Sequence, residues 1–155
     1  LRAAQVRLVV DVRSVPRSRH NPQFNSFAIE DGLCAHWIVY MRIRELGGLR
    51  AASKTVAPDV NGFWIHPGFH HFADYALSVD FRTGLDRLLG LADERRSAIM
   101  CAEAVWWRCH RRIVADYLLL RGREVLHLMG EHRIEPARMT EAAVPAGDGI
   151  HYPRP

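Results

Sequence analysis

The segment from Cys101 to Arg112, CAEAVWWRCHRR, brings together two thiols, a carboxylate, an imidazole and several guanidinium groups. Glu103 is a candidate general acid or base. Cys101 ends an apolar run and is a candidate nucleophile, because a helix N-terminus and nearby arginines lower the pKa of a thiol. His110 is a third candidate catalytic residue. Each also has a structural alternative, since buried cysteines commonly act as small hydrophobic residues and half-buried glutamates commonly pair with arginine.

A second polar segment, RSVPRSRHNPQFN at residues 13–25, is rich in arginine, and no acidic residue lies between Asp11 and Glu30. Planar guanidinium groups suit the recognition of phosphate or carboxylate, so we expect the two segments to form one anion-binding pocket. The alternative is that these arginines only solvate a surface. The expected binding residues are Arg13, Ser14, Arg17, Ser18, Arg19, Gln23, Phe24, Gly47, Gly48, Trp106, Trp107, Arg108, Cys109 and Arg111. The paired indoles could stack on a base or ring, or could simply pack.

A metal site is the less favoured alternative. Cys101, Glu103, Cys109 and His110 are ligand types that zinc or iron accepts, with His127 as a further candidate ligand. No C-x-x-C pair is present. Adjacent residues of a helix point about 100° apart, so Cys109 and His110 are not expected to bind one ion together. The sequence leaves the cofactor unknown, with no cofactor or a metal ion as the alternatives, and the alternative metal site would use Cys101, Cys109 and His127.

Apolar runs and helical periodicity alternate along the chain. The expected strands are residues 7–12, 37–43, 97–102 and 124–129, and the expected helices are 26–35, 70–77, 81–92 and 108–121. This alternation predicts an α/β fold with a small, doubly wound, Rossmann-like sheet that is mostly parallel and flanked by helices. Ligands of such sheets bind beyond the carboxyl ends of the strands, where both polar segments begin.

Length and composition indicate one domain, residues 1–140, followed by a loosely held tail at 141–155 that is rich in Pro, Ala and Gly. The first residues, LRAAQV, resemble the end of a helix and its turn, so we expect a strand and most of a helix to precede them. The chain has no apolar stretch long enough to span a membrane and no signal peptide, which predicts a cytoplasmic protein without a membrane partner. Its three cysteines are then expected to be reduced. The net charge of +4 permits nucleic-acid binding without requiring it.

Four segments together resemble the bacterial family catalogued as domain of unknown function 488. They are DVRSVPRSRHNPQF at 11–24, ELGG at 45–48, CAEAVWWRCHRR at 101–112 and EVLHLMG at 124–130. The resemblance implies a small doubly wound α/β fold and one shared site, but no reaction. The implied site residues are Asp11, Arg13, Ser14, Pro16, Ser18, Gln23, Phe24, Gly47, Gly48, Cys101, Glu103, Cys109, His110 and Arg111. Members usually begin with a strand ending in a Thr-x-Gly-His-Ser-like segment, and nothing here corresponds to it.

The leading hypothesis is an enzyme that acts on an anionic small molecule, a nucleotide or a nucleic acid at the Cys101 to Arg112 segment. The first alternative is a non-catalytic module that binds nucleic acid or another ligand. The second alternative is a metal-binding protein using Cys101, Glu103, Cys109 or His110.

Overall fold

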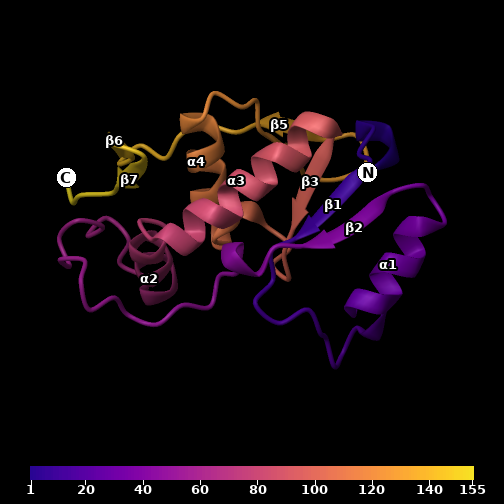
Figure 1. The fold of residues 1–155 in the computed structure, drawn as a ribbon, viewed down its shortest axis with the longest axis horizontal. Helices are drawn as coiled ribbons and strands as arrows, with labels where there is room; N and C mark the ends of the chain where they lie inside the picture. Colours follow the sequence, from indigo (N-terminus) through magenta and orange to yellow (C-terminus); the bar gives the residue numbers. More distant parts are fainter.

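A three-stranded parallel sheet lies at the centre of the computed structural model, which describes all 155 residues (Figure 1). The strands are β1 (Leu8–Asp11), β2 (Val39–Arg42) and β3 (Ser97–Met100), in the order β2-β1-β3. Leu8 pairs with Val39 and Ser97, and Asp11 pairs with Arg42 and Met100. All three strands therefore end at one edge of the sheet.

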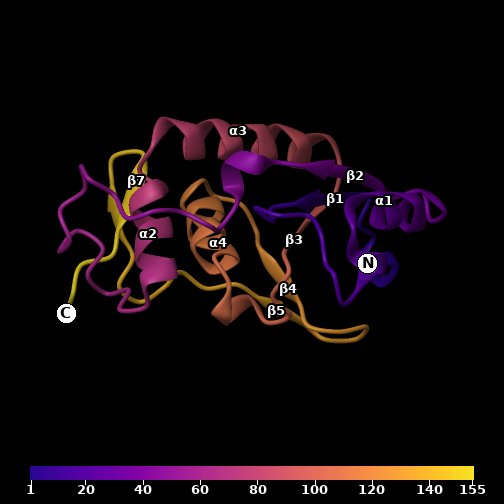
Figure 2. The same cartoon turned by 90° about the horizontal axis from the view of Figure 1, so that it is seen from below.

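Four helices accompany the sheet, α1 (Ser26–Cys34), α2 (Pro67–Tyr75), α3 (Val79–Glu94) and α4 (Arg111–Leu120). Figure 2 shows α3 running along one side of the sheet. Alternate residues of β1 face opposite sides. Leu8 and Val10 enter the main core with residues of α2, α3 and α4, whereas Val9 belongs to a separate cluster of three buried residues. The main core therefore lies on one side of the sheet.

The helix predicted over 108–121 begins later than expected. Trp106–Arg108 form a 3-10 turn (η4), Cys109 is extended at φ −128° and ψ 146°, and α4 starts at Arg111. At the other end, Gly122 has a φ of +72°, as a glycine C-cap requires. The predicted amphipathic character is confirmed, since Ile113, Val114 and Tyr117 are buried in the core.

The fourth predicted strand does not join the parallel sheet. β4 (Leu126–Leu128) pairs instead with β5 (Ile134–Pro136) in an antiparallel hairpin. The chain reverses directly after β4, where the Met129 N–H donates to the Arg133 carbonyl at 2.8 Å. The structure is mixed α/β, with a three-stranded parallel sheet and small antiparallel sheets, and the predicted doubly wound, Rossmann-like arrangement is not confirmed.

The C-terminal segment is packed rather than loosely held. β6 (Val144–Ala146) and β7 (Gly149–His151) form a hairpin, and Ile150 and Tyr152 are completely buried in the main core. The buried carboxylate of Asp116 on α4 accepts hydrogen bonds from the Tyr152 hydroxyl at 2.9 Å and the Thr140 N–H at 2.8 Å. The segment thereby completes the core beside α4. No helix is both long and apolar enough to cross a bilayer.

Candidate functional site

The two polar segments leave the sheet at the same edge. The loop after β1 and the segment after β3 start from neighbouring strands, because Asp11 lies opposite Met100 in the register. The η3 turn (Arg44–Leu46) follows β2, the other neighbour of β1, at this edge. The segment after β4 does not come from this sheet.

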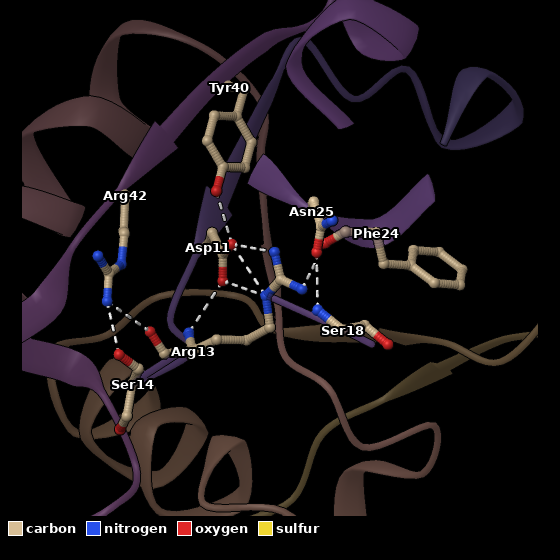
Figure 3. Close-up of polar contacts among 8 residues, drawn as sticks. All are labelled: Asp11, Arg13, Ser14, Ser18, Phe24, Asn25, Tyr40 and Arg42. Atoms are coloured by element: carbon tan, nitrogen blue, oxygen red, sulfur yellow. Dashed lines mark hydrogen bonds and ion pairs between the residues drawn. The ribbon is translucent and has the colours of Figure 1, made fainter. Parts of the chain in front are cut away.

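A buried ion pair between Asp11 and Arg13 organises the loop after β1 (Figure 3). The Arg13 Nη2 lies 2.6 Å from the Asp11 Oδ2, and its Nε contacts both carboxylate oxygens at 2.9 and 3.0 Å. Its Nη1 donates to the Phe24 carbonyl at 2.7 Å, which pins the far end of the loop. The hydrogen bonds to Asp11 raise the pKa of Arg13. Only 4% of Arg13 is exposed, and its guanidinium is engaged by Asp11 and the Phe24 carbonyl, so it is not presented to solvent as the predicted anion binding would require.

Tyr40 and Arg42 on β2 complete this network. The Tyr40 hydroxyl donates to the Asp11 Oδ2 at 2.6 Å, and burial together with this contact raises the pKa of Tyr40 to about 12. The Arg42 Nη2 donates to the Ser14 carbonyl at 2.6 Å (Figure 3). Sequence reasoning missed both residues, because only the β1–β2 pairing places them beside Asp11.

Ser14 and Gly47 join the loops after β1 and β2. The Ser14 Oγ accepts the Leu49 N–H at 2.9 Å, and a Cβ added to Gly47 would lie 2.8 Å from the same oxygen. A Cβ at Gly48 would overlap the imidazole of His110. The absence of a side chain at 47 and 48 therefore lets this loop approach both neighbouring segments. These two predicted site residues act through close packing.

The rest of the loop after β1 is open to solvent. The Ser18 N–H donates to Asn25 Oδ1 at 2.7 Å, as Figure 3 shows, and the Ser18 Oγ accepts the Asn21 N–H at 3.0 Å. Arg17 and Arg19 are exposed and form no ion pair. Phe24 and Gln23 are exposed as well. These side chains are thus free to meet a ligand.

The thiols of Cys101 and Cys109 meet the imidazole of His110 after β3. The His110 Nδ1 lies 3.9 Å from the Cys101 Sγ and 3.6 Å from the Cys109 Sγ. The Cys101 thiol and hydrogen bonds from Arg111 lower the pKa of Cys109 to about 6. The interaction with Cys109 and burial raise the pKa of Cys101 to about 12. The two thiols are therefore coupled, and Cys109, which also receives the Arg111 hydrogen bonds, is the more acidic of the two.

The convergence of Cys109 and His110 contradicts the sequence-based expectation that these neighbours diverge. That expectation assumed a helix through both residues, but Cys109 is extended and precedes α4. His127, the other predicted ligand, is outside the cluster. It stacks on Trp106 with a centroid separation of 4.0 Å and an interplanar angle of 3°, and burial and the nearby Arg111 lower its pKa.

Arg111 links the thiols to the chain beyond β3. Its Nε donates to the Cys109 Sγ at 3.2 Å, and its Nη2 donates to the Glu103 carbonyl oxygen. The Glu103 side chain is exposed and forms no ion pair, so the arginine partner expected in the structural alternative is absent. Trp107 and Arg108 are exposed beside it.

A large groove lies against the face of the sheet opposite the main core. It has a volume of about 1220 Å³, and Val9, Ala98 and Met100 are among its mostly apolar lining residues. Four of the predicted binding residues border it, namely Gln23, Phe24, Trp106 and Arg111, and so does His127 of the alternative metal site. The cysteines are not part of its lining. Arg111 therefore belongs both to the polar edge of the sheet and to the lining of the apolar groove.

Comparison with known proteins identifies a family and no closer relative. No curated protein and no solved structure matches the chain. The model of the family described as domain of unknown function DUF488 matches residues 1–118, which contain the Asp11–Arg13 pair and the cysteine–histidine cluster. Since this match covers well over half of the sequence, the chain belongs to the DUF488 family.

Proposed function

We propose that this protein is an enzyme that acts on a phosphate-bearing or other anionic substrate, of the nucleotide or nucleic-acid class, at the carboxyl edge of its parallel sheet. The observation that carries the proposal is that guanidinium groups gather at this edge and almost none of them forms an ion pair with a carboxylate. Arg13, paired with Asp11, is the one arginine of the edge that does so.

Most of the other arginines of the edge keep their charge available. Arg42 donates only to carbonyl oxygens, which orient its side chain without cancelling its charge. Arg111 donates to the Glu103 carbonyl and also to the Cys109 sulfur, whose acidic thiol offsets part of its charge. Arg17, Arg19 and Arg108 are exposed and have no ion-pair partner. Clustered positive charge without counter-charges attracts anions and suits phosphate, which arginine binds through two parallel N–H donors.

Exposed aromatic side chains support a substrate that carries a base. Trp107 is 46% exposed and Phe24 is 50% exposed, although both types of residue are usually buried. Each base of a nucleic acid offers a face for stacking on such a ring. Phe24 also borders the apolar groove, which could receive the base of a nucleotide whose phosphate meets Arg111.

Glu103 is the candidate for proton transfer. Its carboxylate is exposed, lies two residues beyond Cys101 and is not engaged by any arginine. The experiment is a screen of phosphate esters, nucleotides and modified DNA with the wild type, Glu103→Gln and the matched control Glu141→Gln, whose side chain is exposed outside this edge. We expect at least a hundredfold loss of any turnover in Glu103→Gln and none in the control. Equal turnover by all three proteins would reject this role for Glu103.

The exposed arginines and Trp107 also favour a second candidate, a module that binds nucleic acid without turnover. The discriminating measurement is the affinity for single-stranded oligonucleotides as a function of salt. Binding through phosphates gives a steep linear fall of log K with log salt. Arg108→Ser should reduce that slope, whereas Arg87→Ser, which removes an exposed and unpaired arginine from α3, should not. Salt-dependent binding without turnover of any substrate would favour the module over the enzyme.

A further inference from the structure

We propose that Cys101, Cys109 and His110 form a binding site for one zinc-class metal ion, with the two Sγ atoms and the His110 Nδ1 as ligands and a fourth position open. The three atoms all lie within 4.8 Å of one another. The site lies at the edge of the sheet that is proposed to bind substrate, so the ion would be a cofactor of the proposed enzyme. The binding of the ion, however, does not depend on the substrate class or on turnover.

The two sulfur-to-imidazole separations are close to those around a tetrahedral ion. With zinc–sulfur and zinc–nitrogen bonds of about 2.3 and 2.0 Å, two tetrahedral ligands of these types lie about 3.6 Å apart. The two measured separations from the His110 Nδ1 are 3.6 Å to Cys109 and 3.9 Å to Cys101. An ion could therefore enter between them with small side-chain adjustments.

The ligand types select a soft or borderline ion. Two thiolates and one neutral imidazole favour zinc over magnesium or calcium, which prefer oxygen ligands. The charge of the two thiolates would neutralise a divalent ion. Four-ligand zinc sites are usually structural, whereas sites with three protein ligands keep a position for water or substrate, which fits a site on a substrate-binding edge.

The surroundings hold the ligands in place. The Arg111 Nε–H donates to the Cys109 Sγ at 3.2 Å, an outer contact of the kind that orients metal ligands. The His110 ring packs edge-on against Phe72 at a centroid distance of 4.8 Å, and Gly48 lies so close to the ring that an added Cβ would overlap it. The His110 Nδ1 makes polar contacts only with the two sulfur atoms. The ring is thus oriented toward the thiols before any ion arrives.

Titration of the fully reduced, full-length protein with Co²⁺ alone tests the proposal. We expect one equivalent to bind and to produce thiolate-to-cobalt charge-transfer absorption, which Zn²⁺ then displaces. Cys101→Ser, Cys109→Ser and His110→Gln should each weaken binding at least tenfold. Cys34→Ser is the matched control, because Cys34 is the exposed cysteine outside the cluster, and it should bind like the wild type. Absence of charge-transfer absorption in the reduced wild type, or an equal loss in Cys34→Ser, would overturn the site.

A second measurement needs only the wild-type protein, so it does not depend on whether the variants fold. Alkylation with iodoacetamide is followed by mass spectrometry, with and without one equivalent of Zn²⁺. We expect zinc to slow the modification of Cys101 and Cys109 at least tenfold and to leave Cys34 unchanged. Unchanged rates at Cys101 and Cys109 would refute the metal site. Both measurements are independent of turnover, so a failed substrate screen leaves them interpretable.

Discussion

The carboxylate of Asp11 and the guanidinium of Arg13, two residues apart at the end of β1, form an ion pair that is almost completely buried. The same guanidinium reaches the Phe24 carbonyl, eleven residues further along the chain. The pair therefore holds the two ends of the loop of residues 13–24 together and so helps to fix the position of the exposed arginines in that loop.

Removing one partner of this pair should destabilise the fold strongly. We expect Arg13→Ala to lower the free energy of unfolding by about 3 kcal/mol, because the Asp11 charge stays buried without its main partner. The combined Asp11→Asn and Arg13→Ala variant should lose less than the sum of the two single changes. Denaturant unfolding at neutral pH measures both effects. A loss below about 1 kcal/mol for Arg13→Ala would show that the pair is not structural.

The two glycines at positions 48 and 90 should respond in opposite ways to alanine. A Cβ at Gly48 meets the His110 ring, so Gly48→Ala should cost about 1–3 kcal/mol through overpacking. Gly90 lies inside α3 with no atom within 4 Å of the added Cβ, so Gly90→Ala should gain about 0.5–1 kcal/mol. Denaturant midpoints of the two variants decide the matter. Similar shifts of both midpoints would mean that the loop of Gly48 does not press on His110.

The hydrogen bond from Tyr152 to Asp116 should account for part of the packing of the C-terminal segment. Tyr152→Phe removes the donor at 2.9 Å from a buried carboxylate and should cost about 1.5–3 kcal/mol. Tyr75→Phe is the control, because its hydroxyl donates to the uncharged Glu45 carbonyl at 2.8 Å, and it should cost about 0.5–1.5 kcal/mol. Thermal unfolding of both variants at pH 7 compares them. A smaller cost for Tyr152→Phe than for Tyr75→Phe would contradict this account.

Local patterns predicted most of the elements, because short apolar runs and helical periodicity reflect burial directly. The run at 7–12 became β1, and the helix predicted over 26–35 became α1, which starts at Ser26 after the N-cap residue Asn25. The prediction that the fourth strand joins the parallel sheet was wrong, because a local pattern does not show which strand β4 pairs with. Its partner is a hairpin strand that begins six residues further on. The predicted start of α4 was wrong because a 3-10 turn and an extended Cys109 replace the first turn that was expected there.

The sequence predicted which residues gather at the edge better than it predicted the contacts that they make there. Arginines, thiols and the glycines at 47 and 48 do gather at one edge, as the parallel topology required. The role of Arg13 was missed because it depends on the Asp11 side chain and the Tyr40 hydroxyl, which only the folded sheet brings together. His110 replaced His127 beside the cysteines because an extended residue, not a helix, precedes it.

All four tyrosines should resist ionisation in the folded protein. Burial is the largest cause that raises the pKa of each, and Tyr40 and Tyr117 reach about 12. The unfolded chain should instead ionise its tyrosines near pH 10. Ultraviolet absorbance of phenolate, recorded from pH 8 to 11, should therefore show less ionisation at each pH in the native protein than in denaturant, where four groups ionise near pH 10.

The same shifts determine how stability depends on alkaline pH. Between pH 10 and 12 the folded protein binds more protons than the unfolded chain, so the free energy of unfolding falls as pH rises through this range. The stabilisation is complete below pH 10. Tyr117→Phe removes one of these groups and should flatten the fall, and denaturant unfolding at pH 9, 10 and 11 measures the slope. Phenolate absorbance near pH 10 in a protein that keeps its native circular dichroism would contradict the burial of these side chains.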